Sequence, residues 1–214
     1  MNALLDRLTA SLPLTSIDCG EFSSFRVNGL RFSVEAFHAE GFGHVSLMRA
    51  KGFFGLVRMD TLIATPSAKD LPLLSYDRMQ LFGKDMLLLE LYDTAIVPFD
   101  DAPFQSVAET LSDIADYEAP PRWYDSLRLA GSIGKVGKKM HRARFDAAAL
   151  AFAETYRNAE APDTADKDAK RIKTEAYSEG LLQNGGASTD LFVKKLGAEK
   201  TARLFRTLLF RFQP

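Results

Sequence analysis

Short hydrophobic runs separated by turn sequences fill the first half of the chain. The turns include Asn28-Gly29 and Gly83-Lys84-Asp85, residue types that adopt the positive φ angles of tight hairpins. Because the runs follow one another with no helix between them, they predict an antiparallel meander and not a parallel, doubly wound sheet. The predicted strands span residues 25–27, 30–37, 44–49, 53–65, 73–82 and 86–92.

The hydrophobic period changes to that of a helix beyond Pro98. Between residues 130 and 140, Gly131, Gly134 and Gly137 make the chain too rich in glycine for a helix. Strands followed by helices predict an α+β fold of one domain over residues 1–214, with an antiparallel sheet sandwiched between helices. The predicted helices span residues 1–12, 103–117, 145–161, 170–182, 188–196 and 198–210.

The composition excludes several classes of protein. The 214 residues include a single cysteine, Cys19, and three histidines, which excludes a disulfide framework and a cysteine-based metal cage within the chain. The histidines lack the spacing of a zinc helix, and no metal site is predicted. The hydrophobic runs are far shorter than the roughly 20 residues that span a bilayer. We therefore expect a soluble, cytoplasmic protein with no membrane partner.

The near-zero net charge hides an uneven distribution. Residues 85–121 include nine acidic and no basic residues, whereas residues 122–144 include seven basic residues and one acidic residue, Asp125. Solvated faces are the first explanation of both blocks, and the alternative is a basic surface that docks an anionic ligand or an acidic protein. Nucleic acid is not an expected partner, because aromatic residues lie only at the edge of the basic block and the isoelectric point is about 6.3.

Asp77 is a carboxylate within an otherwise apolar predicted strand. Alternation places it on the same face as Leu73, Ser75, Met79 and Leu81. A carboxylate on an apolar face must be paired, hydrogen-bonded or protonated. Burial raises its pKa, as a proton donor near neutral pH requires. The alternative is that Asp77 caps a bend.

Asp60 is a second strand carboxylate, 17 residues before Asp77. A hairpin that turns around residues 66–70 would place it on the strand next to Asp77. The two carboxylates would then form a pair for proton delivery. The alternative is that Asp60 points to solvent beside Arg58.

The order of several short motifs resembles the ferredoxin-dependent bilin reductases and their relative, red chlorophyll catabolite reductase. The segment 72–77 has the form Pro-apolar-x-x-x-Asp and is followed by a short turn and a strand that ends near Glu90. A Pro-x-Trp motif follows at residues 121–123, and the chain ends in a helix pair around Gly197. The resemblance covers roughly residues 42–210 in consistent order.

The resemblance implies a concrete activity. A linear tetrapyrrole such as biliverdin would lie between the sheet and the C-terminal helices. Ferredoxin would supply single electrons, with no cofactor bound by the chain, and the protein would supply protons. Asp77 would be the main proton donor, assisted by Asp60.

The resemblance also implies ligand contacts. Lys135, Lys138 and Lys139 would hold the propionates of the pigment, and the same positive surface would suit acidic ferredoxin. Trp123, from the Pro-x-Trp motif, is the remaining predicted substrate contact.

The chain departs from the resemblance at two places. Met48 stands where some of these reductases carry Glu, and Gly185-Gly186 stands where many carry Asn-Asp. These departures leave three functions open. They are reduction of a linear tetrapyrrole, a non-catalytic tetrapyrrole-binding or carrier protein on the same fold, and an interaction domain without a pocket.

Overall fold

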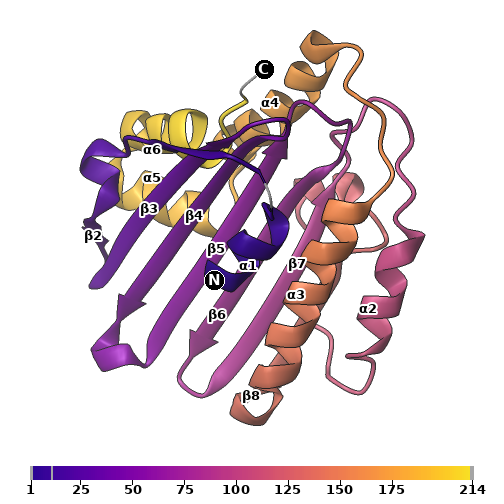
Figure 1. Cartoon of the computed structure of the whole chain (residues 1–214). Coiled ribbons are helices and arrows are strands. Elements are labelled where there is room, and N and C mark those ends of the chain that lie inside the picture. The colour runs from indigo at the N-terminus through magenta and orange to yellow at the C-terminus, as the bar shows by residue number, and fades with distance from the viewer. Residues whose placement is uncertain (1, 11, 213–214) are drawn as a thin grey trace.

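One antiparallel sheet forms the centre of the protein (Figure 1). The computed structural model describes residues 2–10 and 12–212, and within them eight strands pair in the order β1-β3-β4-β5-β6-β7-β8, with β2 beside the first part of β3. Consecutive strands from β3 to β7 are neighbours, which confirms the predicted meander. The strands are β1 (Leu14–Ile17), β2 (Phe25–Val27), β3 (Leu30–Ala39), β4 (Gly43–Gly52), β5 (Val57–Pro66), β6 (Leu73–Leu81), β7 (Lys84–Tyr92) and β8 (Ile133–Lys138).

Helices cover both faces of the sheet, as the sequence predicts (Figure 1). One face packs against α1 (Asn2–Leu8), α2 (Gln105–Glu109) and α3 (Arg142–Asn158). The other face packs against α4 (Lys167–Asn184), α5 (Ala187–Leu196) and α6 (Ala198–Leu204), which continues as a π turn over Phe205–Leu209. Among the described residues, no helix has the length and apolar character needed to cross a membrane.

Strand alternation divides the buried side chains into two cores. On β5, Leu62 and Ala64 pack in the core under α1–α3, whereas Ile63 packs in the core under α4–α6. On β6, Leu74 and Leu73 divide in the same way. Every polar residue on these strands is therefore assigned to one layer by its position in the alternation.

Three strands and the ends of two helices differ from the sequence prediction. The strand expected over 53–65 begins as β5 at Val57, because Phe53–Gly55 form a 3-10 turn, and the helix expected over 1–12 ends as α1 at Leu8. β1 and β8 were not predicted, and the helix expected over 103–117 ends as α2 at Glu109. Residues 115–117 instead run beside β8, where the amide of Tyr117 donates to the carbonyl of Gly134 and that of Val136 to the carbonyl of Ala115, at 3.0 and 2.9 Å. Pairing with the sheet thus outweighs the helical period in this segment.

Glycine suits β8 because other chain segments pack closely on it. A Cβ atom added to Gly137 would lie 2.5 Å from Nδ1 of His141, in the turn that leads into α3. Two of the three glycines that argued against a helix, Gly134 and Gly137, therefore belong to a strand, and Gly137 has close neighbours.

Lys170 fastens α4 to the loops that follow β5 and β7. Its side chain is fully buried, and its ammonium donates to the carbonyls of Leu71 and Thr94 and pairs with Asp70 at 3.4 Å. Asp70 in turn accepts hydrogen bonds from the amides of residues 96 and 97. Burial lowers the pKa of Lys170 to about 8, although Asp70 opposes the shift. This anchor fixes α4 over the sheet.

Replacing Lys170 by Met should destabilise the protein by about 3–5 kcal/mol, because it leaves Asp70 and two carbonyls buried without their cation. Guanidinium denaturation measures the change in the free energy of unfolding. Lys167→Met, at an exposed position on the same helix, is the matched control and should change stability by less than about 0.5 kcal/mol. A loss below 1 kcal/mol for Lys170→Met would contradict the anchoring role.

Candidate functional site

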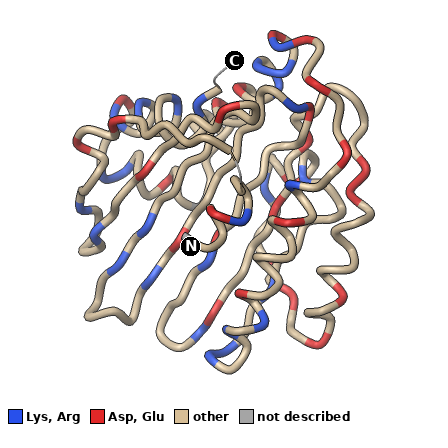
Figure 2. Tube along the Cα trace, viewed as in Figure 1, with Lys and Arg blue, Asp and Glu red and all other residues tan. Residues whose placement is uncertain are grey.

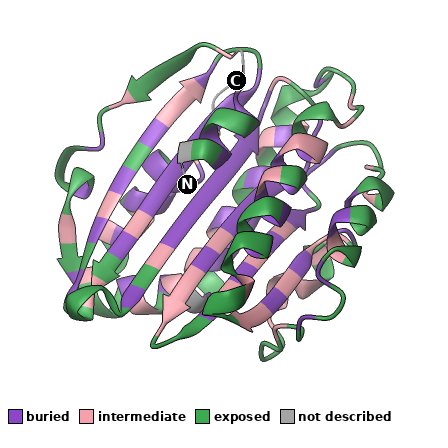
Figure 3. Ribbon diagram, turned by 60° about the horizontal axis from the view of Figure 1, so that its bottom comes forward, coloured by how far each residue is buried: buried purple, intermediate pink, exposed green. Residues whose placement is uncertain are grey.

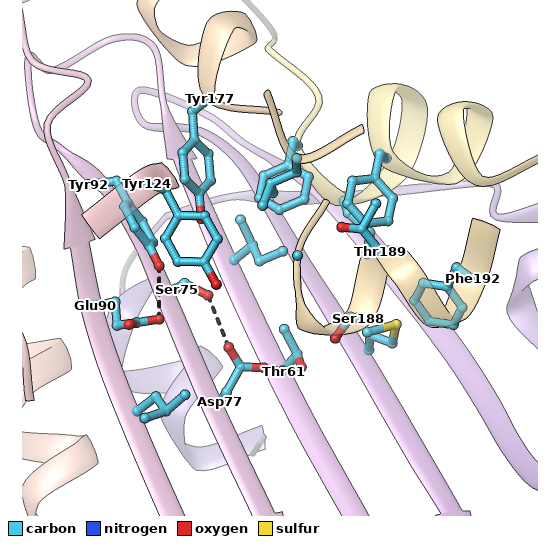
Figure 4. A pocket seen from close by; sticks show the side chains of 18 of the residues that line it. Thr61, Ser75, Asp77, Glu90, Tyr92, Tyr124, Tyr177, Ser188, Thr189 and Phe192 are labelled. Atoms are coloured by element: carbon cyan, nitrogen blue, oxygen red, sulfur yellow. Dashed lines mark hydrogen bonds between the residues drawn. The ribbon is translucent and has the colours of Figure 1, made fainter. Parts of the chain in front are cut away.

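A pocket lies between the sheet and the helices α4–α6 (Figure 4). Its cavity has a volume of about 130 Å³, within about 760 Å³ of empty space that is partly open to solvent. Its floor is formed by side chains of β4–β7 and its roof by those of the C-terminal helices and residue 124. The lining residues are Met48, Met59, Thr61, Ile63, Ser75, Asp77, Met79, Leu88, Glu90, Tyr92, Tyr124, Tyr177, Leu181, Gly186, Ser188, Thr189, Phe192, Phe205, Leu209 and Phe210.

Asp77 is the polar centre of the pocket floor. The hydroxyl of Thr61 donates to its Oδ1 at 2.5 Å and the hydroxyl of Ser75 to its Oδ2 at 3.2 Å (Figure 4). Burial raises the pKa of Asp77 from 3.8 to about 6, and the charge of Glu90 adds to the rise while the two hydroxyls oppose it. None of the described lining residues is basic. The carboxyl can therefore hold or release a proton close to neutral pH.

Glu90 is a second carboxylate in the same pocket. It lies on β7 opposite Ser75, and it accepts hydrogen bonds from Tyr92 at 3.0 Å and from Arg128 at 3.1 Å. The Arg128 side chain is 39% exposed, against 12% for Glu90. The ion pair thus links the pocket to the surface. Glu90 balances its charge with Arg128, whereas Asp77 has no cationic partner.

Three tyrosines form one wall of the pocket. The ring of Tyr92 lies 4.3 Å from that of Tyr177 and 5.9 Å from that of Tyr124, measured between centroids. Burial raises the pKa of all three hydroxyls. They are neutral at physiological pH and can offer hydrogen-bond donors beside apolar ring faces.

Trp123, a predicted substrate contact, supports this wall from behind and does not line the pocket. Its indole nitrogen donates to the carbonyl of Gly185 at 2.9 Å, and its ring lies 6.0 Å from that of Tyr177. Gly180 of α4 makes this packing possible, since a Cβ atom there would lie 2.2 Å from the indole. Trp123 therefore positions Tyr124 and Tyr177.

Asp60 lies on the strand next to Asp77, as expected, but its side chain enters the other layer. In the register of β5 and β6, Thr61 is opposite Asp77 and Asp60 is opposite Arg78. Asp60 instead pairs with Arg58 at 3.1 Å, in a polar cleft on the α1 and α3 side. The two carboxylates therefore do not share a site, which corrects the expected arrangement of the pair.

The three predicted lysines do not line the Asp77 pocket either. Lys135 is buried on the other face of the sheet, where its ammonium donates to the carbonyl of Ile114 at 3.1 Å and pairs with Asp116 at 2.6 Å. Lys138 and Lys139 are exposed at the end of β8. The expected propionate contacts are thus absent from the pocket lining.

No protein-family model and no curated protein sequence matches the chain. Among solved structures, the chain is similar to phytochromobilin synthase from tomato in complex with biliverdin, with a TM-score of 0.78 and 10% sequence identity. The match covers 98% of this chain and 80% of that chain. The two proteins share a fold. The likeness confirms the predicted α+β sandwich, which is the architecture of a bilin reductase.

The two departures from the reductase motifs both reach the pocket. Met48 and Gly186 line it, so an apolar side chain and a glycine stand where some or many of the reductases carry polar groups. The polar side chains that do line the pocket at Thr61, Ser75 and Glu90 were not predicted as site residues. Alternation would have assigned Ser75 to the face of Asp77, but Thr61 and Glu90 also require the strand register.

Asp77→Asn should stabilise the protein at pH 8 and have no such effect at pH 3. Because the pKa of Asp77 is higher in the folded protein than in the unfolded chain, its ionisation lowers the free energy of unfolding as pH rises from about 4 to about 6. The variant should gain on the order of 2 kcal/mol above pH 7. Urea denaturation from pH 3 to 8 measures it, with the exposed Asp6→Asn as control. A gain that does not vary with pH would contradict the raised pKa.

Proposed function

We propose that this pocket binds a linear tetrapyrrole and that Asp77 donates a proton to the pigment while it is reduced. The observation that supports this most is a carboxyl with a pKa near 6, held by two hydroxyls in a pocket lined by apolar and aromatic side chains. A proton donor with such a pKa is effective near neutral pH. The fold shared with a biliverdin-binding reductase adds support.

The pocket lining suits a flat, conjugated and largely apolar ligand. Side chains of Phe192, Phe205 and Phe210 lie at the roof, and the tyrosine wall closes one side. Aromatic faces stack on extended π systems. Because Asp77 and Glu90 are the charged residues of the described lining, the propionates would point out of the pocket mouth in this proposal.

The proposed reaction balances with an external electron donor. Reduction of one pigment double bond takes two electrons, from two reduced ferredoxins, and two protons. Asp77 supplies a proton to the pigment and is reprotonated before the next transfer. Glu90 lies on the same side of the pocket, and its ion pair with Arg128 extends to the surface.

A tetrapyrrole carrier without turnover is the second candidate. Met48 and Gly186 favour it, because neither residue has a side chain that can hold or donate a proton. The two candidates separate in one assay, since a carrier binds the pigment tightly and leaves it unreduced by any donor.

Biliverdin added to the purified protein should give a red-shifted or sharpened absorption band, and reduced ferredoxin should then bleach or shift it. Asp77→Asn should retain binding but slow the reduction by roughly 10²–10⁴-fold, the effect of losing an acid–base group. Anaerobic single-turnover spectroscopy measures the rate.

Asp60→Asn is the matched control, because it removes a neighbouring carboxylate on the opposite face of the sheet. It should leave the reduction rate within about threefold of the wild-type rate. Full activity of Asp77→Asn would refute its role, and binding without reduction in the wild type would select the carrier.

A further inference from the structure

Four turns meet at one end of the strands and form an edge that the pocket does not use (Figure 1). They are the turns between β2 and β3, between β4 and β5, between β6 and β7, and between β8 and α3. We name this region the turn edge and define it as residues 26–31, 51–58, 81–84 and 138–142.

Large apolar side chains stand exposed on the turn edge. The exposed fractions are 52% for Phe53, 108% for Phe54, 56% for Leu56 and 68% for Phe82, and Met140 is also exposed. Figure 3, turned so that the bottom of Figure 1 comes forward, shows exposed residues at the turns. Most of the other large apolar side chains are in the two cores. An exposed apolar group of this kind marks an interaction surface.

The backbone holds two of these turns together. The amide of Phe82 donates to the carbonyl of Leu56 at 3.1 Å, and the rings of Phe53 and Phe82 lie 6.2 Å apart. Phe53, Phe54 and Phe82 have φ angles of 50°, 54° and 47°, in the left-handed region that favours glycine. Phenylalanine is thus retained at positions where the backbone disfavours it and where the side chains contribute little to either core.

The charges of the turn edge all have one sign. It contains eight basic residues and no acidic residue, and blue segments mark its strand ends and turns in Figure 2. Asp60 and Asp85, the carboxylates closest to the turn edge along the chain, are buried beside arginines. Six of the basic side chains are exposed and form no ion pair with a described residue. These six are Arg26, Arg31, Lys51, Lys84, Lys138 and Lys139.

We propose that the turn edge binds the surface of an anionic lipid membrane. Exposed rings at the turns can enter the boundary between headgroups and acyl chains, while the flanking lysines and arginines pair with lipid phosphates. The apolar groups stand at the turns themselves and the cations beside them, as shallow insertion requires. This attachment differs from spanning a bilayer, and it departs from the expectation, drawn from the short hydrophobic runs, that the protein has no membrane partner.

Vesicle co-sedimentation tests the proposal directly. The protein should sediment with phosphatidylcholine vesicles that contain 30% phosphatidylglycerol, and much less with pure phosphatidylcholine. Phe54→Ser with Phe82→Ser should lower the partition coefficient at least on the order of tenfold. Lys51→Gln with Lys84→Gln should lower it roughly 25-fold, or about fivefold for each charge.

Two variants distant from the turn edge are matched controls. Ile172→Ser removes an exposed apolar side chain from α4, and Lys194→Gln removes a charge from α5. Both should bind vesicles like the wild type. Circular dichroism of each variant verifies that it is folded.

Two results would overturn the proposal. One is equal sedimentation with neutral and anionic vesicles, or sedimentation that the turn-edge variants do not weaken. The other is that the wild type binds no vesicles and that the double variant Phe54→Ser with Phe82→Ser needs a higher ferredoxin concentration than the wild type for half-maximal pigment reduction. That outcome would assign the edge to an acidic protein. Pigment binding by these variants reports on the pocket separately, so failure of this inference is distinct from failure of the proposed function.

Discussion

The alternation of side chains across the sheet is the constraint on which the candidate site depends. Each strand from β3 to β7 contributes residues to two separate cores, so a shift of one position moves a side chain from one layer to the other. The register of β5 with β6 places Thr61 beside Asp77 and sends Asp60 to the opposite face. The same rule brings Ser75 and Glu90 into the pocket. The chemistry of the pocket is thus determined by which residues share one face of three neighbouring strands.

The proposed function depends on Asp77, because no basic side chain among the described residues neutralises the charge of this buried carboxylate. Other buried or half-buried carboxylates of this fold form ion pairs with basic side chains. The pairs are Asp70 with Lys170, Asp85 with Arg78 and Glu90 with Arg128. Within residues 2–10 and 12–212, the groups that hold Asp77 are two hydroxyls. The two hydroxyl donors offset only part of the effect of burial, so the pKa of Asp77 rises to about 6. A buried carboxylate without a cation lowers the free energy of unfolding above neutral pH. A role in proton donation would account for a carboxyl at this position despite that loss of stability.

Much of the fold follows from the sequence pattern, and the site follows from it only in part. Strand alternation and turn residues predicted β2–β7, and the helical period predicted α3–α6, because these elements bury regular hydrophobic faces. β8 was missed because it contains two glycines, and the close packing that requires one of them, Gly137, leaves no mark in the local sequence pattern. Asp77 was found from one strand alone, but choosing Thr61 over Asp60 needs the pairing of two strands. Lys135, Lys138 and Lys139 were selected from the resemblance and from their charge, and neither determines the face of the sheet on which a side chain lies.

The central claim is that a linear tetrapyrrole binds over Asp77, between the sheet and the C-terminal helices. A crystal structure of the protein grown with biliverdin tests this most directly. The account predicts pigment density between β5–β7 and α5, with a pyrrole nitrogen or a reacting carbon within about 3.5 Å of an Asp77 oxygen. Pigment bound instead in the cleft of Asp60 on the α1 and α3 side, or an unchanged Asp77 pocket at saturating pigment, would contradict it.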